Sequence, residues 1–224
     1  RFSNDGEFAL GVSTEFPYSR LYAKMQFFPW LELVLKYTET TQDPYGYGYN
    51  VDKGLDVKFR LLEEDKAGFG LALGLNDFAG TGVFSGEYLV ASKAFQNVDL
   101  SVGLGWGRLG GKDHLSNVIG WIDESRKTRG SWYNTSAQGG TLVFEAYFSG
   151  KNTSIFGGLE YFTPIDNLSL KFEYDTSDYS SALGREKAFD KPGDVFELDS
   201  RFNYAINYRV NLGQSDKLDF SLGY

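Results

Sequence analysis

The sequence predicts an all-β fold, an antiparallel up-and-down transmembrane β-barrel with about eleven strands and long outer loops. Apolar and polar residues alternate along many short segments, and short and long connections follow one another in turn. The composition agrees, because aromatic residues make up 17% of a chain that contains 27 Gly and a single Met. Aromatic residues favour strands, and glycine favours tight turns.

Residues 54–62 show the alternation most clearly. Because successive side chains of a strand point to opposite faces, one face of this segment is apolar and the other is charged. A membrane barrel with a polar lumen gives this pattern, and so does a soluble antiparallel sheet with one wet face. The other strands are expected at 7–15, 20–28, 31–37, 68–75, 87–95, 98–107, 154–162, 168–175, 200–210 and 218–224.

The connections fall into two length classes. Short ones follow Phe28, Leu62, Phe95, Phe162 and Val210. Long ones form expected outer loops at about 38–53, 76–86, 108–153 and 176–199. This alternation is typical of outer-membrane barrels with short periplasmic turns, provided that a possible short strand at 142–148 does not span. Within the same loop, 118–126 could form a short helix.

Residues 1–224 are expected to form one barrel domain that is incomplete. Bacterial barrels close with an even number of strands, and an odd number leaves open edges that a membrane does not tolerate. We therefore expect more sequence after Tyr224, or another chain that completes the ring. The start at Arg1 looks processed.

Composition and charge exclude several classes of function. The net charge of -8 argues against nucleic-acid binding. The chain has no Cys and only one His, so neither a transition-metal site nor a cofactor is expected. His114 lies in a polar loop without a catalytic partner nearby in the sequence, and we expect it to be solvated. Asp43, Asp52 and Asp56 do not have the spacing of a calcium loop. No enzymatic activity is expected.

Several segments resemble the YjbH/GfcD family. The matching segments are 6–8 with 11–13, 27–32, 52–54 with 58–64, 77–82 with 87–93, 103–110, 156–161 and 171–175. They cover nearly the whole chain in order. The resemblance implies an outer-membrane β-barrel associated with exopolysaccharide or capsule secretion, located in the bacterial outer membrane. It carries no catalytic motif.

Two sets of side chains follow from the barrel prediction. One parity is expected to face lipid: Leu31, Leu33, Leu35, Leu55, Val57, Phe59, Leu100, Val102, Leu170, Phe172, Tyr204 and Ile206. The other supplies candidates for the lumen or for a polysaccharide path: Asp56, Lys58, Arg60, Asp99, Glu160, Lys171, Glu173, Arg201, Asn203, Asn207 and Arg209. Mixed charges and amides suit hydrogen bonding to sugars, but internal salt bridges in a plugged barrel would use the same residues.

The favoured function is therefore a part in exopolysaccharide or capsule secretion, as a conduit or as a partner of the export machinery. Expected partners are outer-membrane lipids, exopolysaccharide, and polysaccharide-export or other envelope proteins, including a lipoprotein partner. One alternative is a non-conducting structural or assembly barrel that anchors an envelope complex. A second alternative is a soluble carbohydrate-binding β-sandwich.

The segment from Arg108 to about Asn152 carries too many apolar side chains to remain in water. We expect it to fold inward and narrow the lumen, with Trp121, Phe144, Tyr147 and Phe148 as candidates for a gate. Its aromatic rings would then pack against small residues that leave space, namely Gly70, Gly74, Gly103, Gly105 and Gly107. Deleting residues 112–138 would, on this hypothesis, raise the ion conductance.

Overall fold

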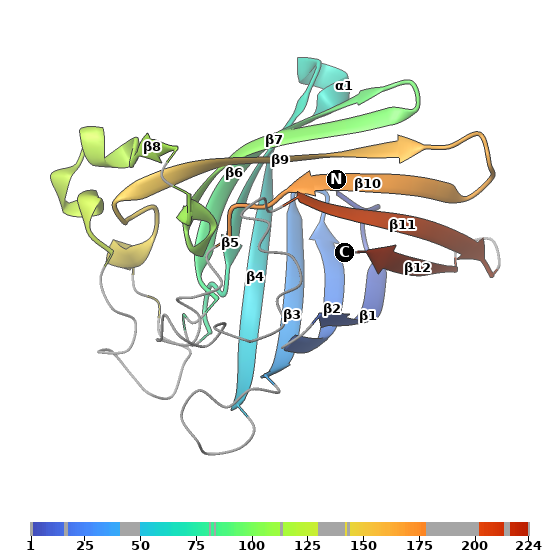
Figure 1. Ribbon diagram of the computed structural model, residues 1–224, viewed down its shortest axis with the longest axis horizontal. Coiled ribbons are helices and arrows are strands. Elements are labelled where there is room, and N and C mark those ends of the chain that lie inside the picture. The colour runs from blue at the N-terminus through green and yellow to red at the C-terminus, as the bar shows by residue number, and fades with distance from the viewer. Residues whose placement is uncertain are drawn as a thin grey trace, which may run out of the picture.

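The computed structural model describes residues 2–15, 18–40, 50–80, 82, 84–112, 114–129, 142, 144–177, 202–212 and 216–223. Eleven strands follow one another in chain order and form a single antiparallel, up-and-down sheet (Figure 1). A twelfth, two-residue strand, β8 (Leu115–Ser116), pairs with the start of β9. Among the helices in these ranges, none has the length and apolar character needed to cross a membrane.

All eleven predicted strands are confirmed, with ends that differ by a few residues. Their bounds are β1 (Phe8–Glu15), β2 (Tyr18–Phe28), β3 (Leu31–Thr40), β4 (Asn50–Leu62), β5 (Gly70–Asn76), β6 (Gly86–Phe95), β7 (Val98–Gly107), β9 (Asn152–Phe162), β10 (Leu168–Tyr174), β11 (Phe202–Asn211) and β12 (Lys217–Gly223). The largest difference lies at the expected loop 38–53. There β3 and β4 continue to pair up to Thr40 and Asn50.

Two local predictions within the long segment 108–153 are wrong or only partly right. The described residues of the range 142–148 contain a 3-10 turn at Phe144–Ala146 instead of a strand. The expected helix at 118–126 is two separate 3-10 turns, at Ile119–Trp121 and Glu124–Lys127. Elsewhere, the short connection between β4 and β5 contains one helical turn, α1 (Glu64–Ala67).

The strand register keeps the two kinds of side chain on separate faces. Across three neighbouring strands, Leu33 pairs with Val57 and Val57 with Leu75, whereas Lys58 pairs with Gly74 on the opposite parity. The sheet curves toward its polar face. This follows because Arg108, after β7, lies over the ring of Tyr18 on β2, although the two strands are far apart in the sheet. Figure 1 shows the curvature.

The apolar face bears large hydrophobic side chains that are exposed along both early and late strands. They include Leu10, Val12, Leu21, Leu35, Leu100, Val102, Ile155, Phe172, Tyr204, Ile206, Phe220 and Leu222. The twelve residues predicted to face outward lie on this parity. The described strands form one sheet, not the two stacked sheets that a sandwich requires, so the β-sandwich alternative is wrong.

Burial is distributed in an unusual way. Many of the most buried side chains are polar, for example Gln26, Glu87 and Thr153, whereas large apolar side chains are exposed. The apolar core is correspondingly small. It consists of Leu75, Ala146 and Tyr147, with Phe59, Phe78 and Phe148 packed against it. A water-soluble protein normally places its large apolar residues inside and pairs or exposes its charges.

Candidate functional site

The concave face of the sheet gathers the predicted lumen residues. Register places Asp99 opposite Glu160, Glu160 opposite Lys171, and Glu173 opposite Asn203. Asp56, Lys58 and Arg60 occupy the same face on β4, and Asn207 and Arg209 occupy it on β11. Arg201 lies outside the described residues. The geometry brings the described candidates onto one surface, and their roles toward a polymer stay predictions.

A set of ion pairs crosses strands β2, β3 and β4 on this face. Glu32 lies between two ammonium groups, at 3.0 Å from Lys24 Nζ and 3.6 Å from Lys58 Nζ. On the same face, Lys36 of β3 forms an ion pair with Asp56 of β4. Charges removed from bulk water are tolerated when they are paired in this way. This part of the polar face is therefore internally compensated, as the salt-bridge interpretation predicts.

A second polar group lies on strands β9 to β12. Glu160 accepts a hydrogen bond from the Ser169 hydroxyl at 2.6 Å and lies 3.9 Å from Lys171 Nζ. Arg209 binds both carboxylate oxygens of Asp219, at 2.7 and 2.9 Å. Bidentate Arg–carboxylate pairs are the most strongly oriented ion pairs in proteins. Asp219, which was not among the predicted residues, is the ordered partner that fixes Arg209.

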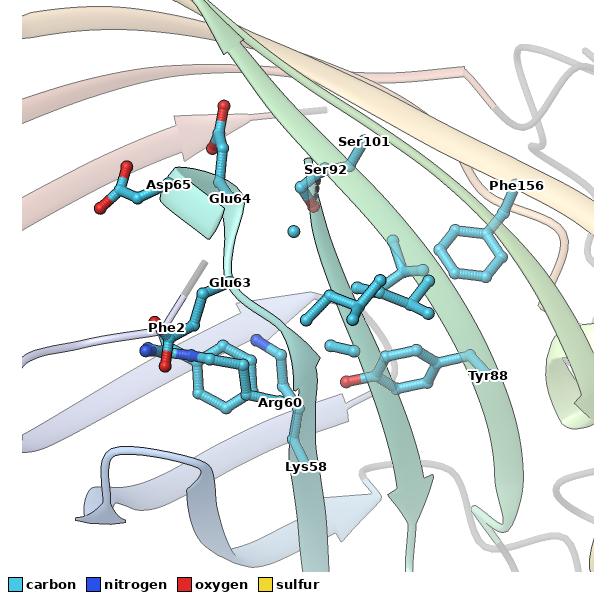
Figure 2. Close-up of a pocket in the computed structure, with 15 residues that line it drawn as sticks. Phe2, Lys58, Arg60, Glu63, Glu64, Asp65, Tyr88, Ser92, Ser101 and Phe156 are labelled. Atoms are coloured by element: carbon cyan, nitrogen blue, oxygen red, sulfur yellow. Dashed lines mark hydrogen bonds between the residues drawn. The ribbon is translucent and has the colours of Figure 1, made fainter. Parts of the chain in front are cut away.

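A pocket of about 510 Å³ opens on the polar face between these two groups (Figure 2). Phe2, from the segment before β1, lies across β4 with its ring 4.6 Å from both Lys58 Nζ and the guanidinium carbon of Arg60. Tyr88 and Phe156 contribute further aromatic surface, packed edge-to-face at 6.1 Å. The pocket thus combines cations with aromatic rings, two features that bind sugars and acidic groups.

The remaining lining of the pocket is polar. The hydroxyl groups of Ser92 and Ser101 are hydrogen-bonded to each other at 2.8 Å. The acidic residues Glu63, Glu64 and Asp65 stand at one edge, around the α1 turn. Glu63 is paired with Lys66 at 2.7 Å, and Glu64 accepts the Ala94 N–H at 2.9 Å. Glu63 and Glu64 therefore stabilise the short connections between the strands.

An aromatic cluster crosses the concave side at the end of the sheet where the long loops lie. Tyr18 and Phe84 pack edge-to-face at 5.7 Å, and both rings lie under the guanidinium groups of Arg20 and Arg108. We call Tyr18, Arg20, Phe84 and Arg108 the crossing cluster. It joins β2 to residues beyond β5 and β7, and so it narrows the space above the polar face. Sequence reasoning did not identify it, because cation–π contacts between distant residues leave no local pattern.

Asp77 lies just outside β5, next to the crossing cluster. Its side chain is 1% exposed, and it accepts the Phe84 N–H at 3.2 Å. Its own N–H donates to Asp56 at 3.0 Å. Burial, and next the negative charge of Asp52, raise the pKa of the Asp77 carboxyl to about 7. Within the described residues, no group of His, Cys, Asp and Glu has the arrangement of a metal site.

The long segment after β7 does not fold as predicted. Its first residues do turn toward the polar face, where Leu109 lies against Gly86 and Gly105. The described residues 114–129 and 144–150 pack on the opposite, apolar face. We call residues 114–129 and 144–150 the cap.

Aromatic residues attach the cap to the apolar face. Tyr147 belongs to the core with Leu75 and donates a hydrogen bond to the Phe78 carbonyl oxygen at 2.6 Å. Phe148 packs edge-to-face on Trp106 at 5.3 Å. For Tyr147 and Phe148, the predicted packing against lumen glycines is therefore wrong. Trp121 and Phe144, the other two gate candidates, are exposed.

The cap packs on the apolar face because the carboxylate of Glu87 lies on that face and needs a partner. Glu87 shares its parity with Leu75 and Trp106, so its carboxylate would otherwise stand among apolar side chains. Glu87 is 0% exposed. Arg129 neutralises its charge, and its carboxylate also accepts a hydrogen bond from the Phe148 N–H at 2.8 Å. The sequence contained this signal, since Glu87 interrupts the apolar parity of its strand.

Asn117 organises the interior of the cap. Its side-chain oxygen accepts hydrogen bonds from the Trp106 indole N–H at 2.9 Å and from the Ile119 N–H at 3.0 Å. Its amide nitrogen lies within 3.0 Å of the carbonyl oxygens of Arg126, Phe148 and Gly150. One buried amide thereby links the two halves of the cap to the sheet.

His114 was expected to be solvated. It is exposed, but its ring also contacts Ile155 and Tyr174. Its Nδ1 accepts the Ile155 N–H at 3.0 Å, and its ring stacks on Tyr174 at 5.9 Å. Its Nε2 is 3.1 Å from the Tyr174 hydroxyl. The residue therefore helps to fix the cap to the start of β9.

These features define an all-β protein with one up-and-down antiparallel sheet, whose polar face turns inward and whose apolar face turns outward. The chain belongs to the YjbH family. The family's profile, described as "Exopolysaccharide biosynthesis protein YbjH", matches residues 1–224. The resemblance found in the sequence is therefore confirmed.

A protein of Escherichia coli (strain K12) named "Uncharacterized lipoprotein YjbH" is 36% identical over 231 residues. The match covers 100% of this chain but only 31% of that relative, so the chain spans less than a third of the relative's length.

Proposed function

We propose that this chain forms part of an outer-membrane β-barrel that takes part in exopolysaccharide secretion, with its concave face lining the path or docking site of the polymer. The observation that carries the proposal is the two-faced sheet. Large apolar side chains are exposed on the convex face of early, middle and late strands. An outward apolar band with a polar interior is the arrangement that lipid selects in a spanning barrel.

Closure of the sheet is part of this proposal. In the described residues β1 and β12 each pair with one neighbour only. Unpaired strand edges are not stable in hydrocarbon, so each edge needs a further strand. Strands from the rest of a longer protein, or from another chain, would close the ring.

The family supports the link to exopolysaccharide, and the relative's name supports the cell envelope as its location. The pocket supports a saccharide-facing role, because it combines the rings of Phe2, Tyr88 and Phe156 with hydroxyl groups and the cations Lys58 and Arg60. Sugars bind proteins through hydrogen bonds and by packing on aromatic faces. In this proposal the protein acts as a conduit or as a partner of export proteins, and it does not act as a catalyst.

A second candidate function is a non-conducting barrel that anchors an envelope complex. The crossing cluster favours it, because the edge-to-face rings of Tyr18 and Phe84 and the Arg108 guanidinium lie over the concave face. An anchor needs no open passage, whereas a conduit needs this cluster to move or to leave a path beside it.

Reconstitution of the natural protein that carries this chain tests both candidates. We expect it to insert into lipid vesicles and to migrate differently in gels before and after boiling, as folded barrels do. In planar bilayers a conduit gives discrete conductance steps, and an anchor gives none. A protein that stays in solution without detergent and does not float with vesicles would overturn the proposal of a membrane barrel.

A further inference from the structure

We infer that the cap is a membrane-interface anchor, in which Trp121, Ile122 and Phe144 insert among lipid headgroups and the adjoining acyl chains beside the barrel. This inference rests on the proposed function, because it requires the convex face of the sheet to meet lipid. It assigns to the cap a partner, the lipid surface, in place of the lumen.

The first argument is the side of the sheet on which the cap sits. Its core residues Ala146 and Tyr147 pack with Leu75, which lies on the apolar parity. The cap covers only the end of this face near the long loops. Beyond it, Val102 on β7 and Ile155 on β9 remain exposed on the same parity. Any lipid that covers Val102 and Ile155 must also border the cap.

The second argument is what the cap leaves uncovered. Trp121 is 69% exposed, Ile122 is 88% exposed and Phe144 is 63% exposed. Apolar side chains this large are unfavourable in water when they gather on one small unit. The Trp121 indole N–H donates to the Ser116 hydroxyl at 3.0 Å. Tryptophan with an apolar ring and a satisfied polar group is the residue that membrane proteins enrich at the interface.

The third argument is that backbone carbonyl groups of the cap find hydrogen-bond donors within the cap itself. Its 3-10 turns leave carbonyl groups without partners from a regular helix or sheet. The Arg126 guanidinium donates to the carbonyl oxygens of Phe144, Glu145 and Tyr147 at 2.9 to 3.1 Å, and Asn117 serves three more. Irregular backbone near hydrocarbon needs such internal partners, because lipid offers none.

The cap and the sheet also form one continuous surface. His114 of the cap accepts the N–H of Ile155, whose side chain is exposed on the apolar face. Leu115, the next residue, is exposed as well. The exposed apolar side chains therefore include Ile155 on β9 and Leu115 on the cap, which lie on either side of the His114 contact. A lipid surface, which is continuous, matches them better than a separate site on a protein would.

Three variants of the natural protein test the inference, each with one cysteine introduced into this chain, which has no Cys of its own, and with any cysteine elsewhere in the protein replaced. Each is labelled with the environment-sensitive fluorophore NBD and reconstituted into phosphatidylcholine vesicles. Ile122→Cys probes the cap, Val102→Cys reports the sheet, and Glu124→Cys is the matched control on an exposed polar position two residues from Ile122. Quenching is measured with spin-labelled lipid and with aqueous iodide. Because position 122 is almost fully exposed, the substitution leaves the cap folded.

The inference predicts that the label at 122 is quenched several-fold more by spin-labelled lipid than the label at 124, and is protected from iodide. If 122 behaves like 124 while 102 is quenched by lipid, the inference fails and the barrel stands. If 102 and 122 both behave as water-exposed positions, the proposed function fails as well. A label at 122 that is shielded from both quenchers would mean that protein covers the cap, which also overturns the inference.

Discussion

Arg129 donates two hydrogen bonds to the carboxylate of Glu87, from Nη1 to Oε2 at 2.9 Å and from Nη2 to Oε1 at 2.7 Å. The pair lies on the apolar face, 42 residues apart in the sequence. Gly107 makes room for it: φ is +61° there, and a Cβ atom would stand 2.6 Å from the Arg129 guanidinium. The pair therefore fixes the cap to the sheet and removes an unpaired charge from the apolar face.

Replacing Arg129 by Met should detach the cap. Glu87 would keep its buried charge but lose its cation, a change that typically costs about 3–5 kcal/mol. Hydrogen exchange of residues 114–129 should accelerate. The matched control is Lys127→Met, which removes an exposed pair with Glu124 at 2.8 Å and should cost less than about 1 kcal/mol. Equal exchange in the two variants would contradict the role of the pair, whereas the double variant Glu87→Gln/Arg129→Met should recover part of the loss.

Replacing Asn117 by Asp should loosen the interior of the cap at almost constant volume. The carboxylate cannot donate to the carbonyl oxygens that the amide now serves, and each buried group left unsatisfied costs roughly 1–3 kcal/mol. We expect faster hydrogen exchange at residues 118–129 and a changed near-ultraviolet signal from Trp106, which donates to Asn117. Ser116→Ala, which removes only an exposed acceptor for Trp121, should leave both unchanged. If the Asn117→Asp and Ser116→Ala proteins show the same exchange rates and the same Trp106 signal, Asn117 does not organise the interior of the cap.

Asp77 should make the loop at the crossing cluster sensitive to pH. Its pKa is raised from 3.8 to about 7 in the folded protein, so folding favours the protonated form. The associated stability is fully present below the ordinary pKa near 4 and is lost as the pH rises through about 7. Exchange at the described loop position Phe84, whose N–H the carboxyl accepts, should therefore be faster at pH 8 than at pH 5 after correction for the intrinsic rate.

Asp77→Asn removes the titrating group, so the corrected exchange rates at the two pH values should become equal. Asp65→Asn, at an exposed position of α1, serves as the control and should keep the pH dependence of the wild type. A dependence that survives in Asp77→Asn would assign it to another group.

The crossing cluster should limit any passage through the proposed barrel. Replacing Phe84 and Arg108 by Ala removes the ring that packs on Tyr18 and the guanidinium that covers both. Single-channel conductance in planar bilayers should rise relative to the wild type. Lys127→Ala, on the cap at the opposite face, is the control and should have no effect. No increase in the Phe84/Arg108 variant would show that the cluster does not obstruct a path.

The strands could be predicted from the sequence because their signal is local. In Leu168–Tyr174, for example, each side chain's face follows from parity alone. The face of the lumen candidates followed in the same way, since Lys171 and Glu173 share a parity. The partners could not be predicted, because pairing of Arg209 with Asp219 depends on the register of two strands across a turn.

The cap could not be placed from the sequence for a different reason. Tyr147 and Phe148 are apolar, and an apolar loop can pack on either face of a sheet. What decides between the faces is the contact of Arg129 with Glu87, which is not local in sequence. The abundance of glycine suggested free space on the polar face, but side chains of the sheet itself fill part of it, with Tyr88 over Gly74 and Phe156 over Gly103.

The central claim is that the convex face meets lipid and the concave face meets water, and strand β11 tests it most directly because the cap does not cover it. Nitroxide labels at single cysteines from 203 to 208 of the reconstituted protein report accessibility to oxygen, which enriches in lipid, and to a water-soluble nickel complex. The account predicts a period of two, with high oxygen and low nickel accessibility at 204, 206 and 208, and the reverse at 203, 205 and 207. Equal accessibility to the nickel complex at both parities would contradict it.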